Sequence, residues 1–214
     1  MTSLVTYLTD PRATVRLRAV MAAGTTPTAD DLETLVDQCA IEPDLQVREM
    51  LTWALIRLPA ELVVPRVLRE LDRPEAQARS QALHTLSKIH DRSVYPQVAA
   101  RLEDLDPGVV RTAWRAAVVL VPDDSRSALA RALAVQLGQA DPEMRLSLSR
   151  ALVGLGADVV EPVLGDAASH RNEDVRAHAA ETERLLHDPS AGSELARERA
   201  RREVALGRTR SAKG

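Results

Sequence analysis

The segment EPDLQVREMLTWALIRL (residues 42–58) contains one copy of a pattern that occurs six times in this chain of 214 residues. Its first seven residues have counterparts in DPRATVR (10–16), RPEAQAR (73–79), DPGVVR (106–111), DPEMR (141–145) and RNEDVR (171–176). The arginines that close these segments lie at positions 16, 48, 79, 111, 145 and 176. A regular spacing of this length is the sequence signature of a repeat protein.

A helical stripe follows each of these arginines. Counted from the arginine, positions −1, +3, +6, +7 and +10 are mostly apolar, which is the spacing of one face of an α-helix. In the second copy these residues are Val47, Leu51, Ala54, Leu55 and Leu58. In the fourth copy they are Val110, Trp114, Ala117, Val118 and Val121, so Trp114 is predicted to lie in the core.

A second helical segment precedes each turn, as in VVPRVLREL (63–71), VYPQVAARL (94–102) and VEPVLGDAA (160–168). A proline is tolerated in the first turn of a helix, so Pro65, Pro96 and Pro162 are predicted to mark helix starts. Each copy is then a helix A, a turn and a helix B. One such pair cannot bury its apolar stripe alone, whereas stacked pairs can. The sequence therefore predicts an all-α fold, an α-solenoid of about six helix pairs.

The combined pattern, V-x-P-x-L/V followed by D-P-x-x-x-V-R-x-x-A-x-x-A-L, resembles HEAT repeats, and in particular the short HEAT-like repeats of phycobilisome lyases. The resemblance implies a right-handed superhelix of HEAT-like pairs over residues 1–189. It also implies an internal ladder at the turns. There an Asp accepts N–H groups at the start of helix B, and the repeat arginine binds turn carbonyls or the neighbouring copy. Arg16, Arg48, Arg79, Arg111 and Arg176 are therefore expected to be structural.

Composition limits the compartment and the chemistry. Cys39 is the only cysteine, which excludes an intramolecular disulfide and a four-cysteine zinc site. The start of the chain, MTSLVTYLTDPR, lacks the features of a signal peptide. The longest apolar run, Ala116 to Val121, is far shorter than the roughly 20 residues that span a bilayer. We therefore expect a cytoplasmic protein that is not embedded in a membrane.

Charge is unevenly distributed between the array and its C-terminal end. Residues 190–214 carry seven basic and three acidic residues, or +4, and the total of −3 leaves −7 for residues 1–189. We expect residues 190–214 to form a basic helix and a disordered tail. The tail is interpreted as a solvated capping element in preference to an arm for nucleic acid or an acidic partner.

This sequence lacks the site residues that enzymes with similar helical arrays use. Deoxyhypusine hydroxylases bind iron through His-Glu dipeptides, which this chain lacks. His178 and Glu181 have the i, i+3 spacing of metal ligands, but no matching pair accompanies them. Alkylpurine DNA glycosylases place a carboxylate beside an aromatic, whereas Arg57 and Val118 lie one turn beyond the two tryptophans. We expect no catalytic site, cofactor or metal.

The B helices are expected to line the concave side of the solenoid, with positions +1, +2, +5, +8 and +9 facing outward. In the first three copies these positions combine apolar and charged residues, as a protein-binding groove does. The predicted binding residues are Leu17, Arg18, Met21, Met50, Trp53, Ile56, Arg57, His84 and Lys88. Two interpretations of Trp53 stay open, because it can face a partner or fold over an adjacent helix as large aromatics often do.

The sequence thus predicts a non-catalytic scaffold that binds a partner protein, as a helix or peptide, on the concave face of its first three copies. A monomer is favoured, and nucleic acid is not an expected partner because the array is acidic. The alternative is a nucleic-acid-binding or DNA-repair protein resembling the alkylpurine glycosylases, or a lyase, on the same scaffold.

Overall fold

The computed structural model of the chain describes residues 4–139 and 141–188, and the predicted tail of residues 190–214 lies outside them. Within the described residues there are α-helices and short 3-10 helices but no strand. The chain divides into two compact units, Met1–Pro122 (unit 1) and Asp123–Gly214 (unit 2). Each unit has its own buried core.

The helices alternate between A and B positions along the chain. The A helices of unit 1 are α1 (Leu4–Leu8), α3 (Leu32–Ile41), α5 (Ala60–Glu70) and α7 (Tyr95–Ala99). Its B helices are α2 (Ala13–Thr25), α4 (Leu45–Leu55), α6 (Ala76–Ile89) and α8 (Pro107–Leu120). Unit 2 pairs α9 (Arg126–Ala134) with α10 (Pro142–Leu155), and α11 (Ala157–Ala168) with α12 (Glu173–His187). The described residues therefore form six helix pairs, and the predicted all-α solenoid is confirmed.

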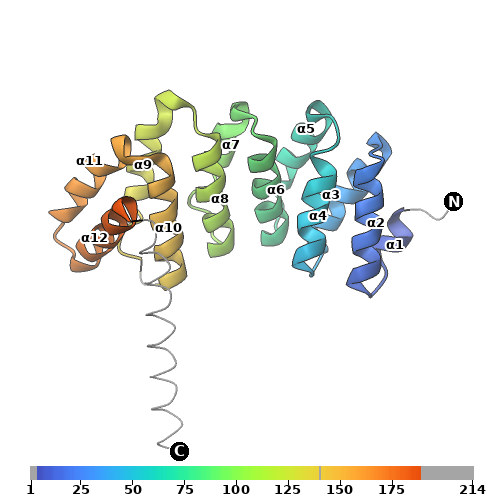
Figure 1. Cartoon of the computed structure of the whole chain (residues 1–214), viewed down its shortest axis with the longest axis horizontal. Helices are drawn as coiled ribbons and strands as arrows, with labels where there is room; N and C mark the ends of the chain where they lie inside the picture. The colour runs from blue at the N-terminus through green and yellow to red at the C-terminus, as the bar shows by residue number, and fades with distance from the viewer. Residues whose placement is uncertain (1–3, 140, 189–214) are drawn as a thin grey trace, which may run out of the picture. The chain divides into compact units, whose positions relative to one another are not determined.

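Short 3-10 helices, η1 (Ala29–Asp31), η2 (Arg92–Val94) and η3 (Asp123–Ser125), lead into α3, α7 and α9. In unit 1 the B helices α2, α4, α6 and α8 follow one another in a row, each packed on the next (Figure 1). The predicted stripe of copy 2 forms their shared core, since Val47, Leu51, Ala54 and Leu55 are each at most 1% exposed.

The N-cap residues define the register of the copies and correct the alignment of copy 4. In the other five copies the repeat arginine lies four residues after the N-cap, as Arg48 does after Asp44. In copy 4 the N-cap is Asp106, so Val110 occupies the arginine's place and the predicted register is wrong by one residue. Pro107 and Pro142 are both the first residues of their helices, but three residues separate Pro107 from Arg111 whereas two separate Pro142 from Arg145.

The corrected stripe of copy 4 is more completely buried than the predicted one. Its members, each at most 1% exposed, are Val109, Ala113, Ala116, Ala117 and Leu120. Trp114 is fully buried, so its predicted place in the core is confirmed, although it lies one position further along the repeat than expected.

Two of the three prolines predicted to start helices lie inside them. Pro96 is at the start of α7 as expected, but Pro65 and Pro162 lie in the middle of α5 and α11. Each of these two interrupts one backbone hydrogen bond of its helix. Both are exposed, so water can solvate the carbonyl that each leaves without a helical partner.

The turns between helices A and B are joined to the preceding copy by buried ion pairs. Arg16 donates two hydrogen bonds to the Glu42 carboxylate, at 2.6 and 2.8 Å, and another to the carbonyl of Asp10. Glu42 is fully buried and also accepts from Gln38 and from the Asp44 N–H. Arg79 and Asp104 repeat this geometry, at 2.8 and 2.9 Å.

The structural role predicted for the repeat arginines is confirmed where these bonds are seen. Arg48 and Arg176 each donate to two carbonyls of their own turn, as Arg16 and Arg79 do. In copy 3, Arg73 occupies the place of the turn acid. Arg48 accordingly reaches Gln77 instead of a carboxylate.

A second polar ladder, not predicted from the sequence pattern, runs between neighbouring B helices inside the core. In unit 1, Gln81 donates to the Thr52 hydroxyl at 2.7 Å. In unit 2, His178 takes the same place: Nδ1 accepts from the Gly138 N–H, and Nε2 lies 3.0 Å from the Arg145 carbonyl and 3.2 Å from the Ser149 hydroxyl. Both ring nitrogens of His178 thus have partners inside unit 2.

We predict that Glu42→Gln lowers the free energy of unfolding of unit 1 by about 3–5 kcal/mol, because it leaves the Arg16 charge buried without a carboxylate. Urea denaturation followed by tryptophan fluorescence measures this, since both tryptophans are in unit 1. Asp10→Asn is the control, because Asp10 pairs with the exposed Arg12 and its loss should change stability little. Equal effects of the two substitutions would contradict the prediction.

We also predict that unit 1 loses stability in acid. Burial raises the pKa of Glu42, but hydrogen bonds from Arg16, the Asp44 N–H and Gln38 outweigh it and hold that pKa below its ordinary value. Hydrogen bonds from Arg79 likewise lower the pKa of Asp104. Because the unfolded chain then binds more protons, stability is present above the ordinary carboxyl pKa of about 4 and is lost as the pH falls below it.

Urea midpoints measured across this pH range test the acid loss. The double variant Glu42→Gln/Asp104→Asn should show a shallower decline than the wild type, because two of the titrating groups are gone. An unchanged decline would show that these two carboxyls are not its source.

Candidate functional site

The solvent-facing side of α2, α4, α6 and α8 in unit 1, here called the B-helix face, carries the nine predicted binding residues. They come from α2, from α4 with the two residues after it, and from α6. The structure leaves Arg18, Met21, Ile56, Arg57 and Lys88 exposed. Leu17, Met50, Trp53 and His84 are half-buried.

Trp53 lies across two adjacent B helices. A Cβ added to Gly24 of α2 would lie 2.2 Å from Cζ3 of the Trp53 ring, so the ring rests on backbone that has no side chain. The Arg57 guanidinium lies 5.6 Å from the ring centroid, within the range of a cation–π contact. Trp53 therefore contributes to packing between α2 and α4 while part of its surface stays accessible.

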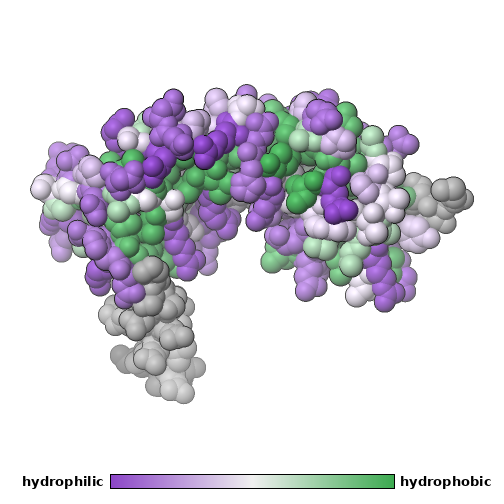
Figure 2. All heavy atoms as spheres, turned by 45° about the horizontal axis from the view of Figure 1, so that its top comes forward, coloured by the Kyte–Doolittle hydropathy of each residue, from purple (hydrophilic) through white to green (hydrophobic). Residues whose placement is uncertain are grey.

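Apolar side chains surround this tryptophan. Met21 precedes Gly24 by about one turn of α2, and Met50 precedes Trp53 by about one turn of α4. Ile56 follows Trp53 at the end of the same helix. Met21 is 47% exposed and Ile56 is 40% exposed. Figure 2 shows that hydrophobic side chains reach the surface of unit 1 in patches among hydrophilic ones.

The half of the B-helix face on α6 and α8 carries basic side chains together with Val119, which is 40% exposed near the end of α8. His84 Nε2 lies 3.4 Å from a carboxylate oxygen of Glu49 on α4, and Lys88 is exposed one turn beyond His84. In the corrected register, the residue of copy 4 equivalent to Trp53 and His84 is Arg115. It is exposed and donates from Nη2 to the Thr112 hydroxyl at 3.2 Å.

Arg115 was not among the predicted residues, because the spacing of the repeat arginines aligns copy 4 on Arg111. The signal that could have placed it is the Asp106-Pro107 pair. Asp106 accepts from the N–H groups of Gly108 and Val109, which fixes the start of α8. Counting from that cap, nine residues lead to Arg115, as nine lead from Asp44 to Trp53.

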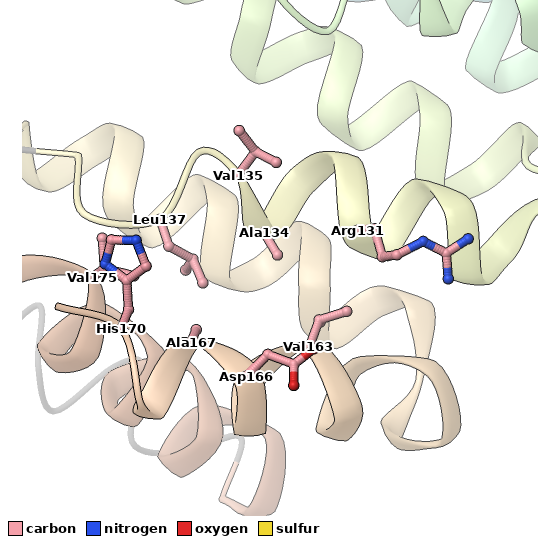
Figure 3. Close-up of a pocket in the computed structure, with 9 residues that line it drawn as sticks. All are labelled: Arg131, Ala134, Val135, Leu137, Val163, Asp166, Ala167, His170 and Val175. Carbon is pink, nitrogen blue, oxygen red and sulfur yellow. The ribbon is translucent and has the colours of Figure 1, made fainter. Parts of the chain in front are cut away.

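Grooves also occur on other parts of the described residues. One, of about 430 Å³, lies between α9 and α11 of unit 2, with Val163 and Ala167 along its wall (Figure 3). Its charged and polar side chains are Arg131 at one end, His170 at the other, and Asp166 between them (Figure 3). Another groove, of about 590 Å³, lies against α1 and α2 of unit 1 and includes Arg18.

Two further observations concern the described residues as a whole. Residues 4–139 and 141–188 bring together no group of three or more His, Cys, Asp or Glu side chains that could hold a metal ion. Among these same residues, no helix has both the length and the apolar character needed to cross a membrane.

Comparisons with known proteins find only structures of low sequence identity and low TM-score. No family model matches the chain, and no curated protein matches it. Among solved structures, an engineered protein is similar with a TM-score of 0.46 and 17% identity, over 87% of this chain and 98% of its own. A designed armadillo repeat protein in complex with the peptide (KR)4 has a TM-score of 0.44 and 14% identity, over 86% and 98%. Likenesses at this level identify no ligand of this chain.

We predict that Gly24→Ala lowers the stability of unit 1 by about 1–3 kcal/mol, because the new methyl group forces the Trp53 ring from its place. The tryptophan emission spectrum should shift to longer wavelength in the same variant. Gly165→Ala in α11 is the matched control, because a Cβ there meets no atom within 4 Å. That substitution should stabilise unit 2, followed by circular dichroism, by about 0.5–1 kcal/mol. A Gly24→Ala variant as stable as the wild type would contradict the packing described for Trp53.

Proposed function

We propose that this chain is a non-catalytic, HEAT-like scaffold that binds a segment of a partner protein, in helical or extended form, on the B-helix face of unit 1. The observation that carries the proposal is the apolar cluster of Met21, Met50, Trp53 and Ile56 across α2 and α4. Exposed charged residues occur on α2, α4 and α6 or just after α4, namely Arg18, Glu49, Arg57 and Lys88, and Arg57 lies over the Trp53 ring.

The composition of this cluster supports a protein partner. Tryptophan and arginine are the residues most often found at the centres of protein interfaces. Methionine side chains adapt their shape to an apolar partner surface. An apolar centre with a charged rim is also the general construction of protein interfaces.

The dimensions of the face suit a single helix or strand. Neighbouring helices pack about 10 Å apart, so the four B helices of unit 1 span about 30 Å from first to last. A helix of about 20 residues has this length. A partner segment of that size can contact all four copies of unit 1 at once.

The proposal is tested by selecting binders from a displayed random-peptide library on the wild-type chain and measuring the affinity of a selected peptide by fluorescence anisotropy. We expect Ile56→Asp to weaken binding by about tenfold or more, since a desolvated charge replaces an apolar contact. Leu62→Asp is the matched control, because Leu62 is 42% exposed, close to the 40% of Ile56, but lies on an A helix.

Circular dichroism should show that both variants keep the wild-type helix content. The proposal fails if the library yields no binder. It also fails if the selected peptides lose affinity with Leu62→Asp and not with Ile56→Asp.

A further inference from the structure

We propose that the partner segment is acidic and amphipathic, with its apolar side chains over α2 and α4 and its carboxylates over α6 and α8. This inference rests on the proposed function and specifies the chemistry of the partner. It is carried by a change of character along the row of B helices, which appears once copy 4 is placed in its corrected register.

Equivalent positions show this change most directly. The position of Trp53 holds Met21 on α2, His84 on α6 and Arg115 on α8. One turn further along, the equivalent residues are Thr25, Arg57, Lys88 and Val119, so basic side chains lie here on α6 and just after α4, and α8 carries an exposed valine. At the position of Trp53 the face therefore passes from thioether and indole groups to imidazole and guanidinium groups over four helices.

The basic side chains of this face are available to a ligand. Among the residues that the structure describes, Arg18, Arg57, Lys88 and Arg115 have no carboxylate partner. By contrast, Arg16 and Arg79 are engaged with Glu42 and Asp104 in the turns. Glu49, which lies beside His84, is the one exposed carboxylate on the B helices of unit 1 within the described residues.

The remaining exposed residues of unit 1 are acidic on balance, because seven exposed carboxylates outnumber the exposed Arg12, Arg69 and Arg92. These carboxylates lie on A helices, on η1, or in turns: Asp30, Glu33, Asp37, Glu61, Asp72, Glu75 and Glu103. Such separation of charge attracts an acidic segment to the B-helix face and disfavours its approach from other directions.

Nucleic acid is the other polyanion that a basic surface could bind, but the α2 and α4 half does not suit it. Met21 and Ile56 are exposed there between the charges. Trp53, the aromatic on which a base could stack, already contacts Gly24 and Arg57. A peptide with apolar and acidic residues satisfies both halves of the face.

The test uses two fluorescein-labelled helical peptides of about 20 residues, the length that spans four B helices. In the first peptide, one half of the length carries Leu and the other half carries Glu. The second peptide has Lys in place of every Glu. We expect the Glu peptide to bind the full-length chain about tenfold or more tightly than the Lys peptide, with an affinity that falls as salt rises.

Charge-reversal variants of the protein show which residues cause the preference for the Glu peptide. The double variant Lys88→Glu/Arg115→Glu should reverse the preference between the two peptides. Arg131→Glu, an exposed arginine on A helix α9, should leave the preference unchanged.

Each other outcome overturns a defined part of this account. If the Glu and Lys peptides bind equally, or if only a library-selected peptide without acidic residues binds, the charge inference fails and the proposed function stands. If no peptide of any kind binds, both fail. Tighter binding of single-stranded oligothymidylate, lost in the double variant, would identify nucleic acid as the ligand of this face.

Discussion

The buried contact between Arg16 and Glu42 is the constraint on which the arrangement of unit 1 depends. It joins the start of one B helix to the turn that precedes the next, and the Glu42 carboxylate is satisfied by four hydrogen bonds. Sliding of one copy along the other would separate Arg16 from Glu42, and the resulting unpaired buried charge would lower the stability of the fold. The repeat of this pairing at Arg79 and Asp104 keeps the B helices aligned, so that side chains at equivalent positions share one face.

The regular features of the fold followed from the sequence, because they recur in every copy. The spacing of the arginines and the apolar stripe predicted the helix pairs and their number. The departures came where local chemistry differs between copies. The helices α5 and α11 continue through Pro65 and Pro162, which face solvent and whose helices are held by packing on their neighbours. The ladder of Gln81 and Thr52 could not be read from the pattern, since each polar group is acceptable in the core only when its partner on the next helix is present.

The candidate site was partly predictable, because the repeated pattern also shows which positions depart from it. Positions that break the apolar pattern pointed to Met50, Trp53 and Ile56, all of which reach the surface in part. The packing interpretation of Trp53 is supported, because its ring lies on α2; the residue stays partly accessible, and its contact with a partner stays a prediction. Arg115 could not be assigned to the face while copy 4 was aligned on Arg111. The hydrogen bonds that Asp106 accepts show which residue begins α8. That correction adds Arg115 to His84 and Lys88, which were already predicted, on the basic half of the face.

The packing of Trp53 on Gly24 also affects how such an array can grow by gene duplication. The ring lies on Gly24, a residue of the preceding copy, and the equivalent residue in copy 2 itself is Ile56. A tandem duplication of copy 2 alone would set the new tryptophan against an isoleucine, with no room for the ring. Duplication of copies 1 and 2 together would carry the glycine along with the tryptophan. The smallest heritable module that preserves this surface is therefore a pair of copies, even though the repeating unit of the fold is one.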